Sequence, residues 1–206
     1  MANLIISAKS GRGWALKELV YFKIEIETVP ALDFFKTAQL PAPTVPAAIM
    51  NNVDLPAGPL PHDARLFFGY LEDAMTGEES MVVDFSAFLL RLLAFDEPDR
   101  LIHCRKELSF EMCGSHVDAK ADVCVVSQVG HHYFFLVQED KRSIDAEPQL
   151  IAETIAAVYQ NNRSRIVAGL PTLQQMVIPG ITMRGATPIF FKIPITQDLE
   201  TSAQPY

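Results

Sequence analysis

Two carboxylates and a lysine near the middle of the chain have the residue types needed for metal-assisted hydrolysis. Asp122 lies in one apolar run, and Glu139 lies in the next, two residues before Lys141. A hard cation such as Mg²⁺ takes oxygen ligands, commonly one or two carboxylates completed by waters and substrate phosphates. A neighbouring lysine can stabilise charge on a phosphate or on the attacking water. The three residues therefore suggest a site for phosphodiester hydrolysis with Mg²⁺ or Mn²⁺.

A predicted β-hairpin positions these side chains. Residues 121–128 and 133–141 are rich in β-branched and apolar residues, which favour strands. Gly130 lies between them and suits the first central position of a tight type II′ turn. The two segments therefore predict an antiparallel strand pair joined by a short turn.

The register of this hairpin decides whether the two acids meet. With Gly130 and His131 at the centre of the turn, Asp122 directly faces Glu139, with Cβ atoms roughly 5 Å apart. Side chains alternate along a strand, so Lys141 shares the face of Glu139. Adjacent carboxylates repel each other, so either Lys141 or a divalent metal must compensate their charge. A register shifted by one residue would put the two acids on opposite faces.

A solvated surface hairpin with an ordinary salt bridge is the alternative interpretation. The runs at residues 123–126 and 133–137 are apolar on both faces. This pattern is typical of a central strand pair covered by helices. The sequence therefore favours a functional site at the end of a buried strand pair.

The same residues resemble a known family. An aspartate on one strand, residues 139–141 (EDK) on the next and a following helix that opens with Gln149 are similar to the PD-(D/E)XK nuclease superfamily, in the subgroup with a helical glutamine after the lysine. The resemblance covers roughly residues 84–196, and Ala121 stands where the family name has proline. It implies an α/β fold with an α-β-β-β-α-β core, in which a mixed sheet lies between helices.

The resemblance also implies an activity and residue roles. The activity is hydrolysis of phosphodiester bonds in DNA or RNA. Asp122 and Glu139 would bind the metal, Lys141 would orient or activate water, and Gln149 would support the site. A solvent-facing side chain is the alternative for Gln149. The sequence leaves open whether a further carboxylate joins the site from Glu72, Glu79, Glu107 or Glu111.

A wider block of sequence also resembles a set of uncharacterised fungal proteins. It comprises the segments QEDKR, EPQLIAETIAA, IPGITM and PIFFKIPIT. That resemblance carries no known activity.

The net charge of −8 argues against a nucleic-acid enzyme until it is divided along the chain. Residues 1–99 hold 7 basic and 14 acidic residues, whereas residues 100–166 hold 8 and 9. The acidity is therefore N-terminal, and the region of the predicted site is close to neutral. No basic patch typical of strong DNA binders is visible. The sequence nevertheless predicts phosphate contacts, and hence nucleic-acid binding, by Lys120, Arg142, Arg163 and Arg165.

The acidic N-terminal region supports a rival function. Residues 30–61 contain half of the 14 prolines and are typical of an extended linker. Such a segment either wraps the domain or binds a partner. The rival is a noncatalytic interaction protein that keeps a nuclease-like core, and homo-oligomer formation through this region is also open.

The chain divides into an N-terminal extension, residues 1–62, and a nuclease-like α/β domain, residues 63–206. The alternating residues 22–28 predict a strand in the extension. Asp84 is a predicted N-cap for a buried helix. Further predicted elements are helices at 63–75, 85–95 and 145–161, and strands at 108–113, 176–183 and 189–195.

Several other classes are disfavoured. Three cysteines with irregular spacing suit buried free thiols rather than a disulfide framework or a zinc site. No P-loop or dinucleotide-binding motif is present. The N-terminal apolar run is too short for a signal peptide, and no stretch approaches the length of a membrane span. We therefore expect an intracellular protein, cytoplasmic or nuclear, that does not contact membrane.

Overall fold

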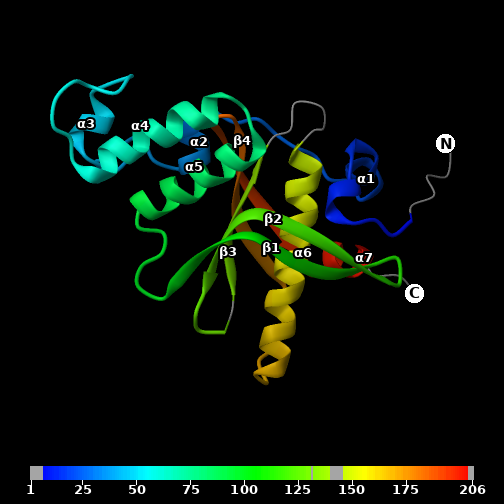
Figure 1. Ribbon diagram of the computed structural model, residues 1–206. Helices are drawn as coiled ribbons and strands as arrows, with labels where there is room; N and C mark the ends of the chain where they lie inside the picture. The colour runs from blue at the N-terminus through cyan, green and yellow to red at the C-terminus, as the bar shows by residue number, and fades with distance from the viewer. Residues whose placement is uncertain (1–6, 131, 140–145, 204–206) are drawn as a thin grey trace.

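A five-stranded mixed sheet forms the centre of the computed structural model, which describes residues 7–130, 132–139 and 146–203 (Figure 1). The spatial order of the strands is their order in the sequence. Neighbouring strands are antiparallel, except that β3 and β4 are parallel. The strands are β1 (Arg100–Met112), β2 (Ser115–Ser127), β3 (Tyr133–Glu139), β4 (Gln175–Arg184) and β5 (Thr187–Thr196).

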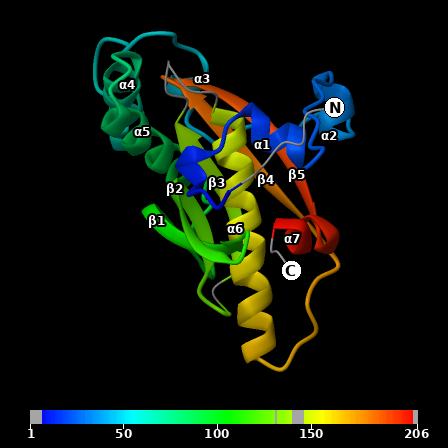
Figure 2. The same ribbon diagram turned by 90° about the vertical axis from the view of Figure 1, so that its right-hand side faces the viewer.

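Helices cover both faces of this sheet (Figure 2). On one face, α4 (His62–Met75) and α5 (Glu79–Leu92) form a core with alternate residues of the central strands, such as Val123 and Val137. On the other face, α6 (Ala146–Val167) packs on the intervening residues, such as Cys124 and Leu136. The prediction of an α/β fold with a helix-flanked mixed sheet is therefore confirmed.

The order of the elements follows from the parallel pair. Strands β3 and β4 can run parallel only with a crossover between them, and α6 is that crossover. The chain thus passes through α5, β1, β2, β3, α6 and β4, and then adds β5 and a short helix α7 (Gln197–Ala203). The predicted strands near residues 176–183 and 189–195 are both present.

Several predicted boundaries are wrong, including the start of β2, which begins at Ser115 rather than at residue 121. Helix α5 begins at Glu79, so Asp84 lies inside it, and the N-cap is Glu78 in an extended conformation. Strand β1 begins at Arg100 rather than at residue 108, because the long hairpin with β2 continues to that point. Helix α6 continues six residues beyond Asn161, to Val167.

The N-terminal segment takes part in the main core instead of forming the predicted strand. Residues 24–30 have no regular secondary structure. Before them, the 3-10 helix η1 (Gly11–Gly13) and helix α1 (Leu16–Tyr21) contact α6. Trp14 and Leu19 are buried in the same hydrophobic cluster as α6. The segment thereby packs against both α6 and β2.

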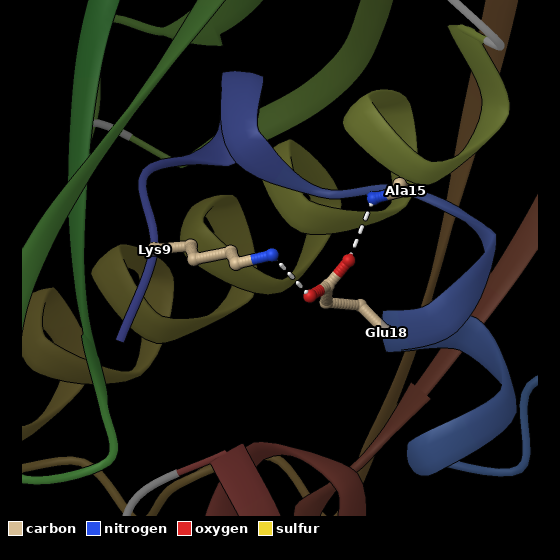
Figure 3. Close-up of polar contacts among 3 residues, drawn as sticks. All are labelled: Lys9, Ala15 and Glu18. Carbon is tan, nitrogen blue, oxygen red and sulfur yellow. Dashed lines mark hydrogen bonds and ion pairs between the residues drawn. The ribbon is translucent and has the colours of Figure 1, made fainter. Parts of the chain in front are cut away.

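One buried carboxylate holds this segment in shape (Figure 3). Glu18 is fully buried and accepts a hydrogen bond at 2.8 Å from the backbone N–H of Ala15, at the start of α1. Its other oxygen accepts from Lys9 Nζ at 2.7 Å. Because the carboxylate is both paired and hydrogen-bonded, its burial is compensated.

The proline-rich region lies outside the core. Two short helices, α2 (Ala31–Phe35) and α3 (Ala47–Met50), interrupt chain without regular structure. Helix α2 contacts the sheet through the rings of Phe35 and Phe190, which lie 6.3 Å apart. None of the helices in the described ranges is long and apolar enough to span a membrane.

The three cysteines are free thiols. Cys124 is buried, as predicted, and burial raises its pKa to about 12. Cys104 is exposed and Cys113 is partly exposed, so the prediction of buried thiols is wrong for Cys104. It faces solvent because the first half of β1 is largely uncovered.

Candidate functional site

The register of β2 against β3 differs by one residue from the predicted register. Val123 pairs with Val137, so the adjoining position places Asp122 opposite Gln138 and not opposite Glu139. The side chains agree, because Gln138 Nε2 donates a hydrogen bond to Asp122 Oδ2 at 2.8 Å. The predicted cross-strand pair of Asp122 and Glu139 is therefore wrong.

The shift originates at the turn. The backbone N–H of Ser127 donates to the carbonyl of His132 at 2.8 Å, with residues 128–131 between them, so the predicted two-residue turn is wrong. Val126 then pairs with Tyr133, but the next pair is Val125 with Phe135, so the register of the two strands shifts between these pairs. Such an irregularity inserts one extra residue into one strand. Together, the longer turn and the bulge displace every following pair by one position.

Other predicted site residues fall partly outside the described residues. Glu139 is the last residue of β3, and its backbone pairs with Met183 of β4. The side chain of Glu139, and Lys141 and Arg142 entirely, are outside the described part of the chain. Their roles in the site stay predictions.

Helix α6 places a glutamine and a glutamate close to Asp122. Gln149 is 7% exposed and donates a hydrogen bond from Nε2 to Glu153 Oε1 at 3.1 Å. The alternative of a solvent-facing Gln149 is therefore excluded. Glu153 has no exposed surface, and burial raises its pKa well above the ordinary value. The negative charge of Asp122 is near enough to raise that pKa further.

Asp122 itself is 3% exposed and lines an open polar pocket of about 370 Å³. The pocket collects side chains from η1, from the beginning of α5 and from β1 and β2. It contains three cations and three carboxylates, together with one hydroxyl. The lining residues are Arg12, Glu78, Glu79, Ser80, Arg105, Lys120 and Asp122.

The predicted nucleic-acid-binding residues divide into two places. Lys120 lines the pocket with Asp122. Arg163 and Arg165 are near the other end of α6, about 21 and about 24 Å along the helix axis from Gln149. Arg165 Nε donates to the carbonyl of Pro171. These two arginines therefore do not contribute to the pocket.

The sequence interpretation missed Arg12. A Cβ atom on Gly11 would lie 2.9 Å from Cβ of Ala119, so the chain can pass this close to β2 only with glycine. This close approach carries the next residue, Arg12, to the pocket, where its guanidinium lies 3.8 Å from Glu79. The Gly-Arg-Gly sequence was the available signal. Glu79 is one of the carboxylates that the sequence left open as a further ligand.

The donors around Asp122 are compatible with a hard cation. No three His, Cys, Asp or Glu side chains among the described residues form a metal-binding group. Mg²⁺ commonly needs only one or two protein carboxylates. Asp122 and Glu79 line one pocket, and Glu153 Oε2 is buried without a hydrogen-bond partner within the described ranges. Oxygen donors of this kind suit Mg²⁺ or Mn²⁺ better than a soft metal.

Comparison with known proteins finds no family model that matches the chain and no curated sequence that matches it.

Proposed function

We propose that this protein is a metal-dependent nuclease that hydrolyses phosphodiester bonds of DNA or RNA on a PD-(D/E)XK-like core. The observation that carries the proposal is the placement of Asp122, a buried carboxylate of a central strand, in a pocket lined by Arg12, Arg105 and Lys120. Carboxylates that bind a metal and cations that bind phosphate are the two parts that this reaction requires. The passage of the chain through α5, β1, β2, β3, α6 and β4 supports the same assignment.

The residues around the pocket have separable roles. Asp122 and Glu79 are the carboxylates that would hold Mg²⁺ or Mn²⁺, which supplies charge stabilisation and a more acidic bound water. Gln138 orients Asp122 through the 2.8 Å hydrogen bond. Gln149 acts on the site through Glu153. Lys141 and Glu139 keep the roles that the family resemblance implies.

Cleavage assays on purified protein test this proposal. We expect cutting of single- or double-stranded DNA or RNA with Mg²⁺ or Mn²⁺ and none with chelator. Asp122→Asn and Lys141→Ala should each reduce kcat by at least about 100-fold, because each removes a charge that acts on the transition state. Asp118→Asn is the matched control, since Asp118 is an exposed residue of the same strand. Absence of cleavage across the substrate panel, or cleavage that persists in both variants, would refute the proposal.

The rival function, a noncatalytic interaction protein, also has a supporting observation. The N-terminal region exposes many large apolar side chains, and exposed apolar patches mark interaction sites. Under this rival, the chain cuts no nucleic acid, and deletion of residues 30–61 changes its association behaviour in sedimentation. The exposed residues are Ile26, Val29, Leu32, Phe35, Leu40, Met50, Val53 and Leu55.

A further inference from the structure

The pairing of β1 with β2 is interrupted beside Asp122. Cys104 pairs with Val123 and Lys106 pairs with Ala121, but the ladder passes over Arg105 and Asp122 between them. Arg105 has a φ of 54°, in the left-handed region that residues other than glycine, asparagine and aspartate rarely adopt. This conformation costs about 1–2 kcal/mol.

The interruption changes which face each residue of β2 occupies. Before it, Ala119 and Ala121 belong to the core that contains α6. After it, Cys124 belongs to that core, whereas Val123 belongs to the core on the α5 side. The regular alternation therefore breaks at Asp122, opposite Arg105. Strain of this kind is often found at functional sites, where it directs a side chain.

Arg105 is suited to bind an anion from solvent. Its side chain is exposed and lines the same pocket as Asp122 and Lys120. No carboxylate in the described part of the chain lies within ion-pair distance of Arg105, whereas Arg12 lies beside Glu79. A guanidinium offers two parallel donors to phosphate, which makes arginine a preferred ligand for it.

We infer that Arg105, with Lys120 beside it, binds a backbone phosphate of a nucleic acid strand at the Asp122 pocket. This inference rests on the proposed function and names the residue that holds the substrate. The contact is with phosphate and not with a base, so it is independent of sequence and sensitive to salt. It forms in the ground state, so it affects KM more than kcat.

The experiment uses Arg105→Asn, because asparagine tolerates the left-handed conformation and removes only the cation. Binding of a fluorescein-labelled 20-nucleotide single strand, as DNA and as RNA, is followed by anisotropy with chelator at 50 to 200 mM KCl. Loss of one phosphate contact should weaken binding roughly fivefold at 0.1 M salt and lower the slope of log K against log[salt] by about 0.7. Arg105→Lys should retain the slope. Lys36→Asn removes another exposed cation in the left-handed conformation, at the end of α2 beside β5, and should change neither quantity.

The outcomes separate this inference from the proposed function. Wild-type affinity and salt slope in Arg105→Asn would overturn the inference even if the protein cuts nucleic acid. Equal losses in Arg105→Asn and Lys36→Asn would also overturn it, because binding would then depend on overall charge. A protein that neither binds nor cuts either strand would refute the proposed function itself. Cleavage with a raised KM and nearly unchanged kcat in Arg105→Asn would support both.

Discussion

Gln138 Nε2 donates a hydrogen bond to Asp122 Oδ2 at 2.8 Å between two buried side chains of neighbouring strands. A buried carboxylate is destabilising unless it is hydrogen-bonded or paired. The Gln138 amide thus stabilises the Asp122 carboxylate in the folded protein and fixes the direction of the other carboxylate oxygen, Oδ1. Gln138, rather than Glu139, is therefore the immediate cross-strand neighbour of Asp122.

Gln138→Leu should therefore destabilise the protein by about 1–3 kcal/mol, because Asp122 loses a donor while it stays buried. Urea unfolding gives the free energy of unfolding for this variant, for Asp122→Ala, which removes the acceptor, and for the double variant. A coupling energy of about 1 kcal/mol or more between the two positions is expected. Gln175→Leu, at an exposed position of β4, is the control and should change stability by less than about 0.5 kcal/mol. Additive effects of the two substitutions would contradict the assigned contact.

The close passage of the N-terminal segment over β2 gives a second prediction. Gly11→Ala places a Cβ atom 2.9 Å from Cβ of Ala119, so the segment must move away from the sheet. We expect a loss of about 1–3 kcal/mol in thermal or urea unfolding, as for other overpacked sites. Because Arg12 moves with the segment, the affinity for a nucleic acid strand should also fall.

Gly69→Ala is the matched control for this substitution. Gly69 lies inside α4, and nothing lies within 4 Å of a Cβ atom built there. Alanine should therefore raise stability by about 0.5–1 kcal/mol through helix propensity. A stable Gly11→Ala variant with unchanged binding would show that the segment does not need this close approach.

Local sequence pattern was sufficient to predict most of the sheet and the crossover helix. The apolar run at residues 123–126 predicted a strand covered on both faces, and this run is buried by α5 and α6. The helix predicted at residues 145–161 is present as α6, and its apolar residues, including Leu150 and Ile155, share a core with the sheet. In both cases the burial pattern is repeated over several residues, so a short segment of sequence contains it.

The site was harder to predict because it depends on single-residue events. One extra residue in a hairpin reverses the facing of every later side chain, and no composition signal distinguished the tight turn from the longer one before Tyr133. Arginine has no preference for the left-handed conformation that Arg105 adopts, so the sequence does not indicate it. Trp14 belongs to a core whose α6 residues are distant from it in sequence. Periodicity detects none of these.

Glu153 gives a prediction about pH. Below about pH 4.5, the ordinary pKa of glutamate, this residue is protonated in both the folded and the unfolded chain. As the pH rises above that value, the unfolded chain loses the proton first, since burial and the charge of Asp122 raise the pKa in the folded protein. The free energy of unfolding should therefore fall as the pH rises toward the folded pKa.

Glu153→Gln should remove this part of the decline. The amide oxygen introduced by this substitution still accepts the hydrogen bond from Gln149. The melting temperature of the variant, relative to that of wild type, should rise with pH above about 4.5. Glu147→Gln is the control on the same helix, at a partly exposed position. Melting curves between pH 4 and 8 that stay parallel for wild type and Glu153→Gln would show that Glu153 is not held in its neutral form.

The last prediction concerns metal binding to the folded protein, independently of catalysis. A ligand that binds only the folded chain stabilises it by mass action, by about 2.7 kcal/mol at 100 times its dissociation constant. Millimolar Mn²⁺ should therefore raise the melting temperature relative to chelator, because it also relieves repulsion between Asp122 and the acids near it. Asp122→Asn should lose most of this gain, whereas Asp118→Asn, exposed on the same strand, should keep it. Equal melting temperatures of wild type with Mn²⁺ and with chelator would argue against a metal site at Asp122, and with it against the proposed chemistry.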